Sequence, residues 1–425
     1  MTTIFANNPN LSTWVEISTN TDFPIQNLPF GIIYNNSLTP RVASRISDYA
    51  IDILALQELG YLNDLAFTKA DFDSNSLNNM MRFGKVGTRK LRDHIAQLFD
   101  SNNTSIKNNK THQEQVLIPI NSIENLLPVK IGDYTDFYSS IEHATNVGTM
   151  FRDPNNALLP NWKHIPVGYH GRASSVVLSG TPLHRPKGQQ KPKDDEGPVF
   201  GPSKLLDFEL EMAFITYEGK PLGDSISTKE ADDYIFGMVL FNDWSARDIQ
   251  KWEYVPLGPF LAKNFGSSVS AWVVTLDALE NFRVKGPNQD PKVFPYLEYE
   301  GDKNIDINLE VQIQPENKEA STICNSNYKY MYWNQNQQLA HHTVNGCDIH
   351  AGDMYASGTI SGPTEDSYGS MLELSWKGSK TIKLKDDDER KFIQDNDTVI
   401  MKGYCKKGDL RIGFGHVETK ILPAK

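Results

Sequence analysis

The sequence predicts a mainly β protein with some α-helix, and the helical patterns gather near its N-terminal end. Apolar and polar residues alternate strictly over residues 305–314 and again over residues 206–214, as expected where successive side chains of a strand point to opposite faces. Gly-Pro pairs recur at residues 201–202, 258–259 and 362–363, which is typical of turns between strands. No rhythm of strand, helix and strand is visible, so a doubly wound parallel sheet is not expected.

Two helices and an exposed loop are predicted in the N-terminal part. The first helix spans residues 41–59 and is ended by Gly60, a common C-terminal signal. Its apolar residues recur near helical spacing: Val42, Ile46, Ala50, Ile53, Leu54 and Leu59. The second begins at about Thr88, and its apolar stripe consists of Leu91, Ile95, Leu98 and Phe99. The polar stretch 101–110 is interpreted as an exposed loop.

Composition excludes several classes of protein. Among 425 residues, 42 Lys and Arg stand against 53 Asp and Glu, which gives a net charge of −11 without any basic block, so nucleic-acid binding is not expected. No stretch approaches the roughly 20 apolar residues of a membrane helix. The three cysteines cannot build a disulfide framework. Because the first residues also lack a secretory pattern, we expect a cytoplasmic protein.

The strand over residues 206–214 carries three carboxylates on one face. Asp207, Glu209 and Glu211 alternate with apolar residues, and such a face is often simply solvated. Two other segments supply further carboxylates, Asp136 in an aromatic-rich stretch and Asp243 at the end of an apolar strand. Carboxylates that converge from several strand ends can bind a hard cation such as Ca²⁺ or Mg²⁺.

A short helix is predicted after Asp243. Arg247 and Gln250 share one of its faces, because residues three apart on a helix are neighbours. One interpretation is an ordinary surface helix with an ion pair between Asp243 and Arg247. The other is that Arg247 and Gln250, joined by Lys263, point at a developing anion.

His143 is the one histidine in the polar and aromatic stretch 133–143. A lone histidine is more often structural than catalytic, but a carboxylate from elsewhere could orient it as a general base. Glu373 is a candidate for that role, because it lies in what is otherwise an apolar strand.

Three other kinds of site find no support. His341, His342, Cys347 and His350 do not match the ligand spacing of a zinc site. The sequence also contains no Gly-x-Ser-x-Gly elbow, and no Gly-x-Gly-x-x-Gly follows a strand.

Together these segments resemble the fumarylacetoacetate hydrolase family over essentially the whole chain. The residues that carry the resemblance are 27–33, 133–152, 168–175, 206–214, 240–266, 356–363 and 369–378. One departure is Ser267, where the animal members are expected to have Thr, so the hydroxyl is kept. The resemblance implies a small N-terminal SH3-like barrel over residues 1–128, a larger C-terminal mixed β-sandwich roll over residues 129–425, and a homodimer.

The resemblance also implies roles for individual residues. The ligands of a catalytic Ca²⁺ would be Asp136, Glu209, Glu211 and Asp243. The surroundings of a structural Mg²⁺ would be Asp243, Lys263 and Ser267. The substrate-binding residues would be Tyr138, Arg152, Tyr169, Gln250, Tyr254 and Thr359. The base pair would be His143 with Glu373, and the oxyanion would be stabilised by Arg247, Gln250 and Lys263.

The activity implied by the resemblance is hydrolysis of a carbon–carbon bond in 4-fumarylacetoacetate, the final step of tyrosine and phenylalanine catabolism. The partner would then be a small diketo acid, with neither nucleic acid nor membrane involved. Two alternatives stay open: a related acylpyruvate hydrolase or oxaloacetate decarboxylase, and a non-catalytic protein stabilised by metal. The N-terminal part and the His143 segment argue against the first, and the combination of His143, Glu373 and Lys263 argues against the second.

Overall fold

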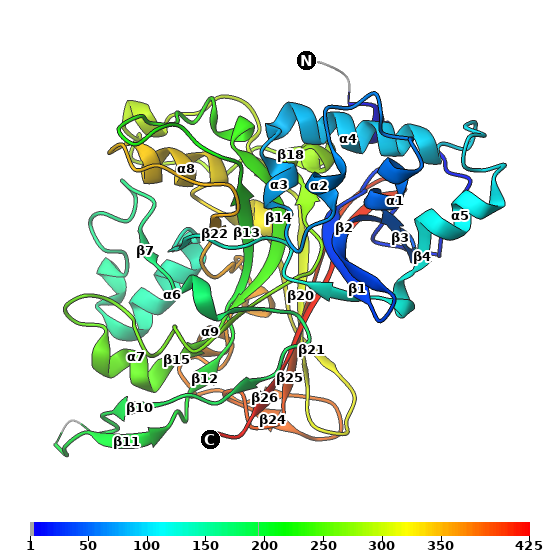
Figure 1. Ribbon diagram of the computed structural model, residues 1–425. Helices are drawn as coiled ribbons and strands as arrows, with labels where there is room; N and C mark the ends of the chain where they lie inside the picture. The colour runs from blue at the N-terminus through cyan, green and yellow to red at the C-terminus, as the bar shows by residue number, and fades with distance from the viewer. Residues whose placement is uncertain (1–3, 194) are drawn as a thin grey trace.

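Three sheets of five or more strands organise the part of the chain that the computed structural model describes, residues 4–193 and 195–425 (Figure 1). One of the two five-stranded sheets belongs to the N-terminal part, and the other packs face to face with the eight-stranded sheet in the C-terminal part. The expected fold class is confirmed: the molecule is mainly β, contains some helix, and has a small N-terminal unit beside a larger β-sandwich. None of the helices in these two ranges is both long and apolar enough to cross a membrane.

The N-terminal sheet is antiparallel throughout, in the order β4-β3-β2-β1-β5. Its strands are β1 (Phe30–Asn35), β2 (Leu38–Ile46), β3 (Tyr49–Asp52), β4 (Leu117–Pro119) and β5 (Glu124–Leu126). The helices around it are α1 (Ile53–Glu58), α2 (Lys69–Phe72), α3 (Asn78–Met81), α4 (Gly84–Phe99) and α5 (Lys110–Val116). Short 3-10 turns occupy Phe5–Asn7 and Ile120–Ser122.

The helix predicted over residues 41–59 is wrong for most of its length. Residues 41–46 continue strand β2, β3 follows, and only Ile53–Glu58 is helical. Val42, Ile46 and Ala50 are spaced four apart, a spacing that suits one face of a strand as well as one face of a helix. Pairing with β1, in which Ile32 lies opposite Val42, decides between the two.

The second predicted helix is confirmed as α4, whose buried residues include Leu91, Ile95, Leu98 and Phe99. Residues 101–109 form the predicted loop, and the backbone turns through it until α5 begins at Lys110. Ile106 is an exception in this polar stretch, because its side chain is fully buried in the N-terminal core.

The largest sheet has the order β7-β6-β22-β13-β14-β16-β8, with β17 also pairing with β14. Its strands are β6 (Tyr134–Phe137), β7 (Gly168–His170), β8 (Val176–Leu178), β13 (Leu210–Thr216), β14 (Ile235–Asp243), β16 (Ser267–Val269), β17 (Val274–Thr275) and β22 (Met354–Ala356). The pairs β6–β22 and β8–β16 are parallel, and the other pairs are antiparallel.

The second C-terminal sheet has the order β21-β20-β25-β26-β9. Its strands are β9 (Leu183–His184), β20 (Asn308–Gln314), β21 (Ser321–Asn327), β25 (Thr398–Lys407) and β26 (Leu410–Leu422). The predicted alternation of residues 305–314 is confirmed, because every second residue of β20 is buried.

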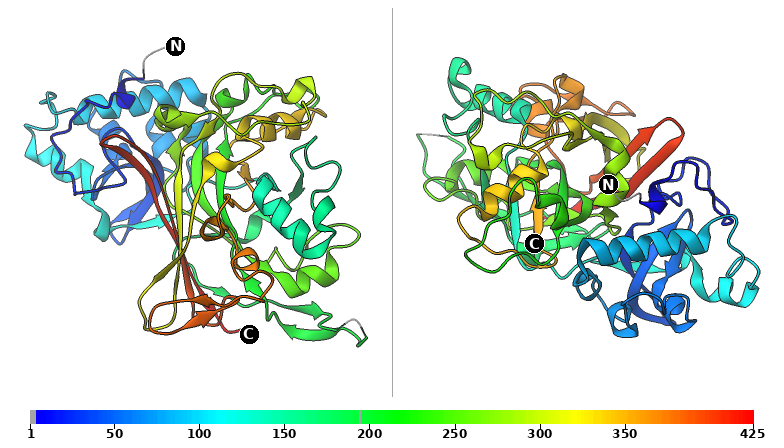
Figure 2. Two further views of the ribbon diagram at one scale, coloured as in Figure 1. Left: turned by 180° about the vertical axis from the view of Figure 1, so that it is seen from behind. Right: turned by 90° about the horizontal axis from the view of Figure 1, so that it is seen from above.

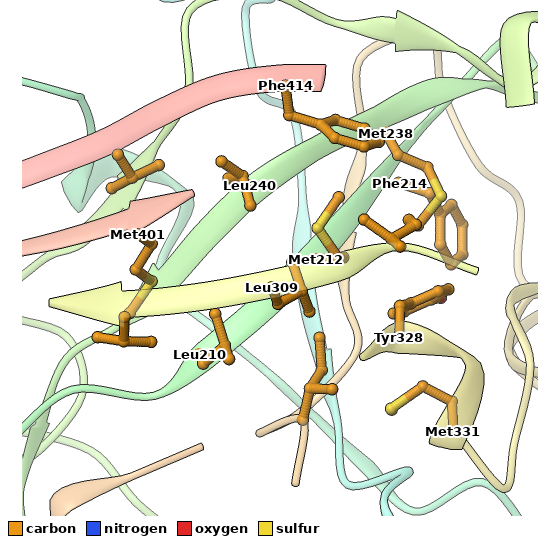
Figure 3. Close-up of a cluster of buried hydrophobic side chains, with 14 of the residues drawn as sticks. Leu210, Met212, Phe214, Met238, Leu240, Leu309, Tyr328, Met331, Met401 and Phe414 are labelled. Atoms are coloured by element: carbon orange, nitrogen blue, oxygen red, sulfur yellow. The ribbon is translucent and has the colours of Figure 1, made fainter. Parts of the chain in front are cut away.

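The core of the sandwich lies between these two sheets. Leu210, Met212 and Phe214 of β13 turn toward it, and Figure 3 shows them gathered with Leu309 of β20 and Met401 of β25. The opposite face of β13 carries residues 211, 213 and 215, and Glu209 directly precedes the strand. The apolar members of that face belong to the N-terminal core, so the N-terminal unit covers one end of the face and leaves the acidic residues at the other end.

The remaining elements lie around the sandwich. The helices are α6 (Ile141–Phe151), α7 (Arg247–Glu253), α8 (Gln335–Thr343) and α9 (Met371–Leu374). Four two-stranded pairs are β10 (Lys187–Gln190) with β11 (Val199–Pro202), β12 (Leu206–Asp207) with β15 (Ser245–Ala246), β18 (Arg283–Val284) with β19 (Asn304–Ile305), and β23 (Ile382–Lys383) with β24 (Glu389–Arg390). The 3-10 turns are Pro154–Asn156, Ala173–Ser175, Ala231–Asp233, Leu276–Phe282, Pro295–Leu297, Tyr328–Tyr330 and Glu365–Ser367.

Polar contacts join the N-terminal unit to the sandwich. Arg89 of α4 forms a two-point ion pair with Asp277, with both N–O distances at 2.6 Å. The long β25–β26 hairpin reaches the N-terminal segment (Figure 2), where the Gly413 amide donates to the Asp22 carbonyl at 2.8 Å.

Candidate metal centre and active site

Four carboxylates meet near the ends of strands β6, β13 and β14 of the largest sheet. One ligand oxygen from each of Asp136, Glu209, Glu211 and Asp243 lies within 4.8 Å of the others. Their exposed fractions are 3%, 6%, 0% and 1%. The structure therefore brings together the four carboxylates that the resemblance implied as ligands, and these four do not form a solvated acidic face. Asp207, the third carboxylate of the predicted strand, is not among them.

Strand register explains how these residues meet. Leu210 lies opposite Asn242 in the β13–β14 pair, which puts Glu209 and Asp243 side by side. The Asp243 amide donates to the Glu209 carbonyl at 3.3 Å. Asp136 comes from β6, which is separated from β13 only by β22, and the residue opposite it in β22 is the small Ala356.

Two of the four carboxylates are poorly satisfied by the protein alone. Asp136 Oδ1 and Glu211 Oε1 are buried and have no hydrogen-bond partner. Burial raises the pKa of Asp136 well above its usual value, and repulsion from Asp243 adds to this effect. Burial likewise raises the pKa of Glu211, with a further contribution from Asp136. A cation in this cluster would give both unpartnered oxygens a ligand bond and would offset the cost of burying the two negative charges, because it takes carboxylate oxygens as ligands.

Glu209 differs from these two because cations already neutralise it. Burial alone would raise its pKa, but Lys263 and Arg247 outweigh burial and lower the pKa to about 2. Lys263 Nζ forms ion pairs with Glu209 and with Asp243, the latter at 2.6 Å. Burial opposes the charge of Lys263, but Asp243 and Glu209 raise its pKa above the usual value, so it stays a cation.

Gly358 supplies a backbone donor to the cluster. Its amide donates to Glu211 Oε2 at 2.9 Å, and its φ of 79° lies in the left-handed region. A Cβ at this position would lie 2.3 Å from the Phe137 carbonyl oxygen. Only glycine tolerates both the positive φ and the close approach of the Phe137 carbonyl without strain.

His143 and Glu373 form a buried pair beside the cluster. His143 Nδ1 lies 2.7 Å from Glu373 Oε2. The Ser140 hydroxyl caps the N-terminus of α6 by accepting from the His143 amide at 3.1 Å, which anchors the first turn that carries the ring. The expected strand around Glu373 is wrong: residues 371–374 form helix α9. The apolar neighbours Met371 and Leu372 are buried by this helical turn.

Other donors, which no pattern in the sequence singled out, hold the Glu373 carboxylate. Ser361 Oγ and Ser370 Oγ each donate to Oε2 at 2.9 Å, and Asn146 Nδ2 donates to Oε1 at 2.9 Å. Burial opposes the charge of Glu373, but His143, Asn146 and Ser361 lower its pKa below the usual value. Asn146 lies three residues after His143 on α6, and this spacing is the signal that could have identified it.

The structure also brings Arg247, Gln250 and Lys263 together. Arg247 Nη1 lies 2.7 Å from Glu209 Oε1 and 3.4 Å from Gln250 Oε1, and Lys263 binds the same Glu209. Arg247 Nη2 is buried and has no partner. The ion pair considered between Asp243 and Arg247 is wrong. Because α7 begins only at Arg247, helical spacing does not apply to the two residues.

Tyr138, Tyr169, Thr359 and Ser267 lie close to these groups. The Tyr138 ring meets the His143 ring edge-on at 5.2 Å. The Tyr169 hydroxyl donates to Asp243 Oδ2 at 3.1 Å, and Ser267 Oγ donates to Asp243 Oδ1 at 2.8 Å. Thr359 is buried directly after Gly358.

Arg152 and Tyr254 lie farther out. Arg152 is exposed at the end of α6, and its Nε and Nη2 donate to the Ala157 carbonyl at 3.1 and 2.6 Å. Its charge still acts on Tyr138. Burial and Glu373 raise the pKa of Tyr138 above its usual value, and Arg152 offsets part of this rise. Tyr254 caps α7 and is 52% exposed. Neither side chain contacts the acidic cluster in the described part of the chain.

The N-terminal and C-terminal parts of the chain each match a family model. Residues 134–422 match the model described as fumarylacetoacetate (FAA) hydrolase C-terminal. Residues 26–128 match the model described as fumarylacetoacetase N-terminal.

Curated relatives are similar over nearly their whole length. A fumarylacetoacetase of Dictyostelium discoideum is 53% identical over 97% of this chain and 98% of its own. Those of Homo sapiens and Arabidopsis thaliana are 50% and 46% identical, each over 97% of this chain and 99% of their own.

Solved structures share the fold at low identity. A fumarylacetoacetate hydrolase from Exiguobacterium antarcticum is 16% identical and superimposes with a TM-score of 0.51, covering 94% of this chain and 100% of its own. A maleylpyruvate hydrolase from a Sphingobium species is 12% identical with a TM-score of 0.50, covering 93% of this chain and 100% of its own.

Proposed function

The chain belongs to the fumarylacetoacetate hydrolase family, and we propose that it cleaves 4-fumarylacetoacetate by hydrolysis to fumarate and acetoacetate. It is thus a hydrolase that acts on a carbon–carbon bond of a ketonic substrate, and the reaction would be the final step of tyrosine and phenylalanine catabolism. The observation that carries the proposal is the buried His143–Glu373 pair beside a cluster of four carboxylates.

The reaction makes two demands on the site. Water must attack a ketone carbonyl, and the fragment that departs must leave with the electrons of the carbon–carbon bond. The first demand requires a base that removes a proton from water. The second requires positive charge and fixed donors where the oxygens become anionic.

We propose that Asp136, Glu209, Glu211 and Asp243 hold a Ca²⁺ ion, which when bound polarises a carbonyl and stabilises enolate charge. The fit is supported by the unpartnered oxygens of Asp136 and Glu211 and by the all-oxygen donor set, which is the set that Ca²⁺ prefers. Asp243, Lys263 and Ser267 would surround a structural Mg²⁺. Lys263 would not ligate the ion, because a protonated amine has no lone pair to offer a metal; it would hold the carboxylate of Asp243, with which it forms an ion pair.

His143 is proposed as the general base. Its Nδ1 is engaged by the Glu373 carboxylate, so Nδ1 carries the ring proton and Nε2 is left as the acceptor. Nε2 would take a proton from the attacking water, and the imidazolium would then return that proton to the carbanionic carbon of acetoacetate. Glu373 would hold the ring in this orientation and stabilise its positive charge.

Arg247, Gln250 and Lys263 are proposed as stabilisers of the tetrahedral oxyanion. The unpartnered Nη2 of Arg247 supports this role, because a buried donor without an acceptor is costly unless a ligand supplies one. The side chains proposed to bind the carboxylates and oxygens of the substrate are Tyr138, Arg152, Tyr169, Gln250, Tyr254 and Thr359. Among them Arg152 is suited to a terminal carboxylate, because its planar fork can bind two oxygens.

We also propose the division into residues 1–128 and 129–425, a homodimeric assembly and a cytoplasmic location. The division is supported by the ends of the two sheets, since β5 ends at Leu126 and β6 begins at Tyr134. Sedimentation of the purified protein would test the assembly, with a mass of one chain as the contradicting result.

Incubation of the purified protein with fumarylacetoacetate and Ca²⁺ tests the proposed function. We expect fumarate and acetoacetate in equal amounts. Acylpyruvates and oxaloacetate serve as comparison substrates, because they probe the related activities of the same superfamily. No cleavage of fumarylacetoacetate, or faster turnover of oxaloacetate, would contradict the proposal.

A further inference from the structure

Asp207 is separated from the other two carboxylates of its predicted strand. Strand β12 ends at Asp207 and pairs with β15, whereas β13 begins at Leu210 and pairs with β14 and β22. Asp207 is therefore absent from the group formed by Glu209 and Glu211. It is nevertheless completely buried, and a buried carboxylate that binds no metal needs partners of another kind.

Those partners are two backbone amides and one guanidinium. Asp207 Oδ1 accepts from the Met371 amide at 2.6 Å, and Oδ2 accepts from the Leu372 amide at 3.0 Å. Oδ2 also accepts from Arg247 Nε at 2.8 Å. Asp207 thus joins the first turn of α9, which carries Glu373, to the start of α7, which carries Arg247.

The contacts of Arg247 show that Asp207 helps to fix the orientation of its guanidinium group. Asp207 engages Nε, Glu209 engages Nη1, and Nη2 is left without a partner. A planar guanidinium held at two of its nitrogens has no freedom to rotate, so the direction of the third nitrogen is set.

We infer that Asp207 is a positioning residue, which aims the free Nη2 of Arg247 at the oxygen that becomes anionic in the reaction. The inference rests on the proposed function, because it assumes that Arg247 stabilises an oxyanion. Asp207 touches no reacting atom and acts only through Arg247. A donor aimed in advance at the transition state raises kcat and contributes little to substrate binding.

The variant Asp207→Asn tests this role with little change of shape. The amide can keep its oxygen on the Met371 side, so one of the two bonds to α9 is kept, while its NH₂ group faces Arg247 Nε and the Leu372 amide and cannot accept from either. We expect kcat to fall by about tenfold to a hundredfold with KM within about twofold, as for a misdirected oxyanion donor. The matched control is Asp248→Asn. Asp248 follows Arg247 on α7, but it accepts from Ser203 Oγ at 2.6 Å and from the Lys204 amide at 2.7 Å, away from Arg247.

A double variant separates positioning from general stability. If Asp207 acts through Arg247, adding Asp207→Asn to Arg247→Lys should change kcat by less than about twofold beyond the single Arg247→Lys variant. A purely structural role would lower kcat by the same factor in both backgrounds. Calorimetric titration with Ca²⁺ and thermal melting would show whether each variant is folded.

Chemical rescue gives a second, independent readout of the same role in variants that thermal melting shows to be folded. Added guanidinium should restore part of the activity of Arg247→Ala, because Asp207 and Glu209 can hold the free cation, and rescue should be lost in Asp207→Ala/Arg247→Ala. Equal rescue in both backgrounds, or kcat of Asp207→Asn equal to that of Asp248→Asn, would overturn the inference. A wild-type protein that does not cleave fumarylacetoacetate would instead overturn the proposed function.

Discussion

Nδ1 of His143 lies 2.7 Å from Oε2 of Glu373, although the two residues are 230 positions apart in the chain. The first turn of α6 carries the histidine, and α9 carries the glutamate. Because both side chains are buried and the carboxylate accepts three further donors, the ring orientation is set before any substrate arrives.

Glu373→Gln should lower kcat less than loss of the base itself. The donors Ser361 and Ser370 favour the amide oxygen at the position of Oε2, so His143 keeps its hydrogen bond but loses the negative charge that stabilises its protonated form. We expect kcat to fall by about ten- to a hundredfold. The new NH₂ group would face the Asn146 NH₂ group, so the further change Asn146→Asp should recover part of the melting temperature. A wild-type kcat in Glu373→Gln would contradict the orienting role.

Removal of bound metal should abolish turnover and destabilise the protein. EDTA would leave Asp136 and Glu211 facing each other without a cation, and Ca²⁺ or Mg²⁺ should restore both activity and melting temperature. Glu211→Gln should bind Ca²⁺ at least about tenfold more weakly, because one charged ligand is lost. Glu218→Gln is the control, since Glu218 lies on the surface paired with His350. Full activity in EDTA, or nitrogen or sulfur ligands in a metal-bound structure, would contradict the proposed site.

Gly358→Ala should be costly, and Gly301→Ala provides a measure of the backbone contribution alone. Both glycines have positive φ, 79° and 76°, but a Cβ meets the Phe137 carbonyl only at position 358. The free energy of unfolding of Gly358→Ala should therefore fall by about 1–3 kcal/mol more than that of Gly301→Ala, and Ca²⁺ affinity should fall with it. If urea denaturation showed the same loss of unfolding free energy in both variants, the contact between a Cβ at position 358 and the Phe137 carbonyl would be unimportant.

Stability should depend on pH through Asp232. Burial raises its pKa, but Arg283 and Lys303 outweigh burial and lower it to about 2. A carboxylate with a lowered pKa stabilises the fold above its unfolded value of about 3.9, and this contribution is lost as pH falls toward 2. Asp232→Asn should therefore lower the free energy of unfolding by about 2 kcal/mol at pH 7, with a smaller difference near pH 3. The control Asp224→Asn changes an exposed carboxylate. If the difference in unfolding free energy between the wild type and Asp232→Asn grew on acidification, the lowered pKa of Asp232 would be contradicted.

Local patterns predicted those parts of the molecule in which one periodicity was unambiguous. Strict alternation predicted β20, and an apolar stripe predicted α4. The helix predicted over residues 41–59 was wrong because a spacing of four fits both a helix and a strand, and the pairing partner β1 is a separate segment of the chain. Long-range pairing of this kind leaves no local trace.

The candidate site could be predicted as a set of residue types but not as a set of contacts. Alternation correctly gave Glu209 and Glu211 a common face, but it could not show that the strand breaks after Asp207 and sends that carboxylate to Arg247. Nor could it identify Ser361 as a donor to Glu373, because serine is common in turns and only the fold brings these side chains together.

His143→Gln, assayed for fumarate release from fumarylacetoacetate with Ca²⁺ binding measured on the same sample, tests the central claim most directly. We expect normal folding and Ca²⁺ binding, with kcat lowered by about 10²–10⁴, the usual contribution of a general base. Near-normal kcat in a folded, Ca²⁺-loaded His143→Gln would contradict general-base catalysis by this histidine.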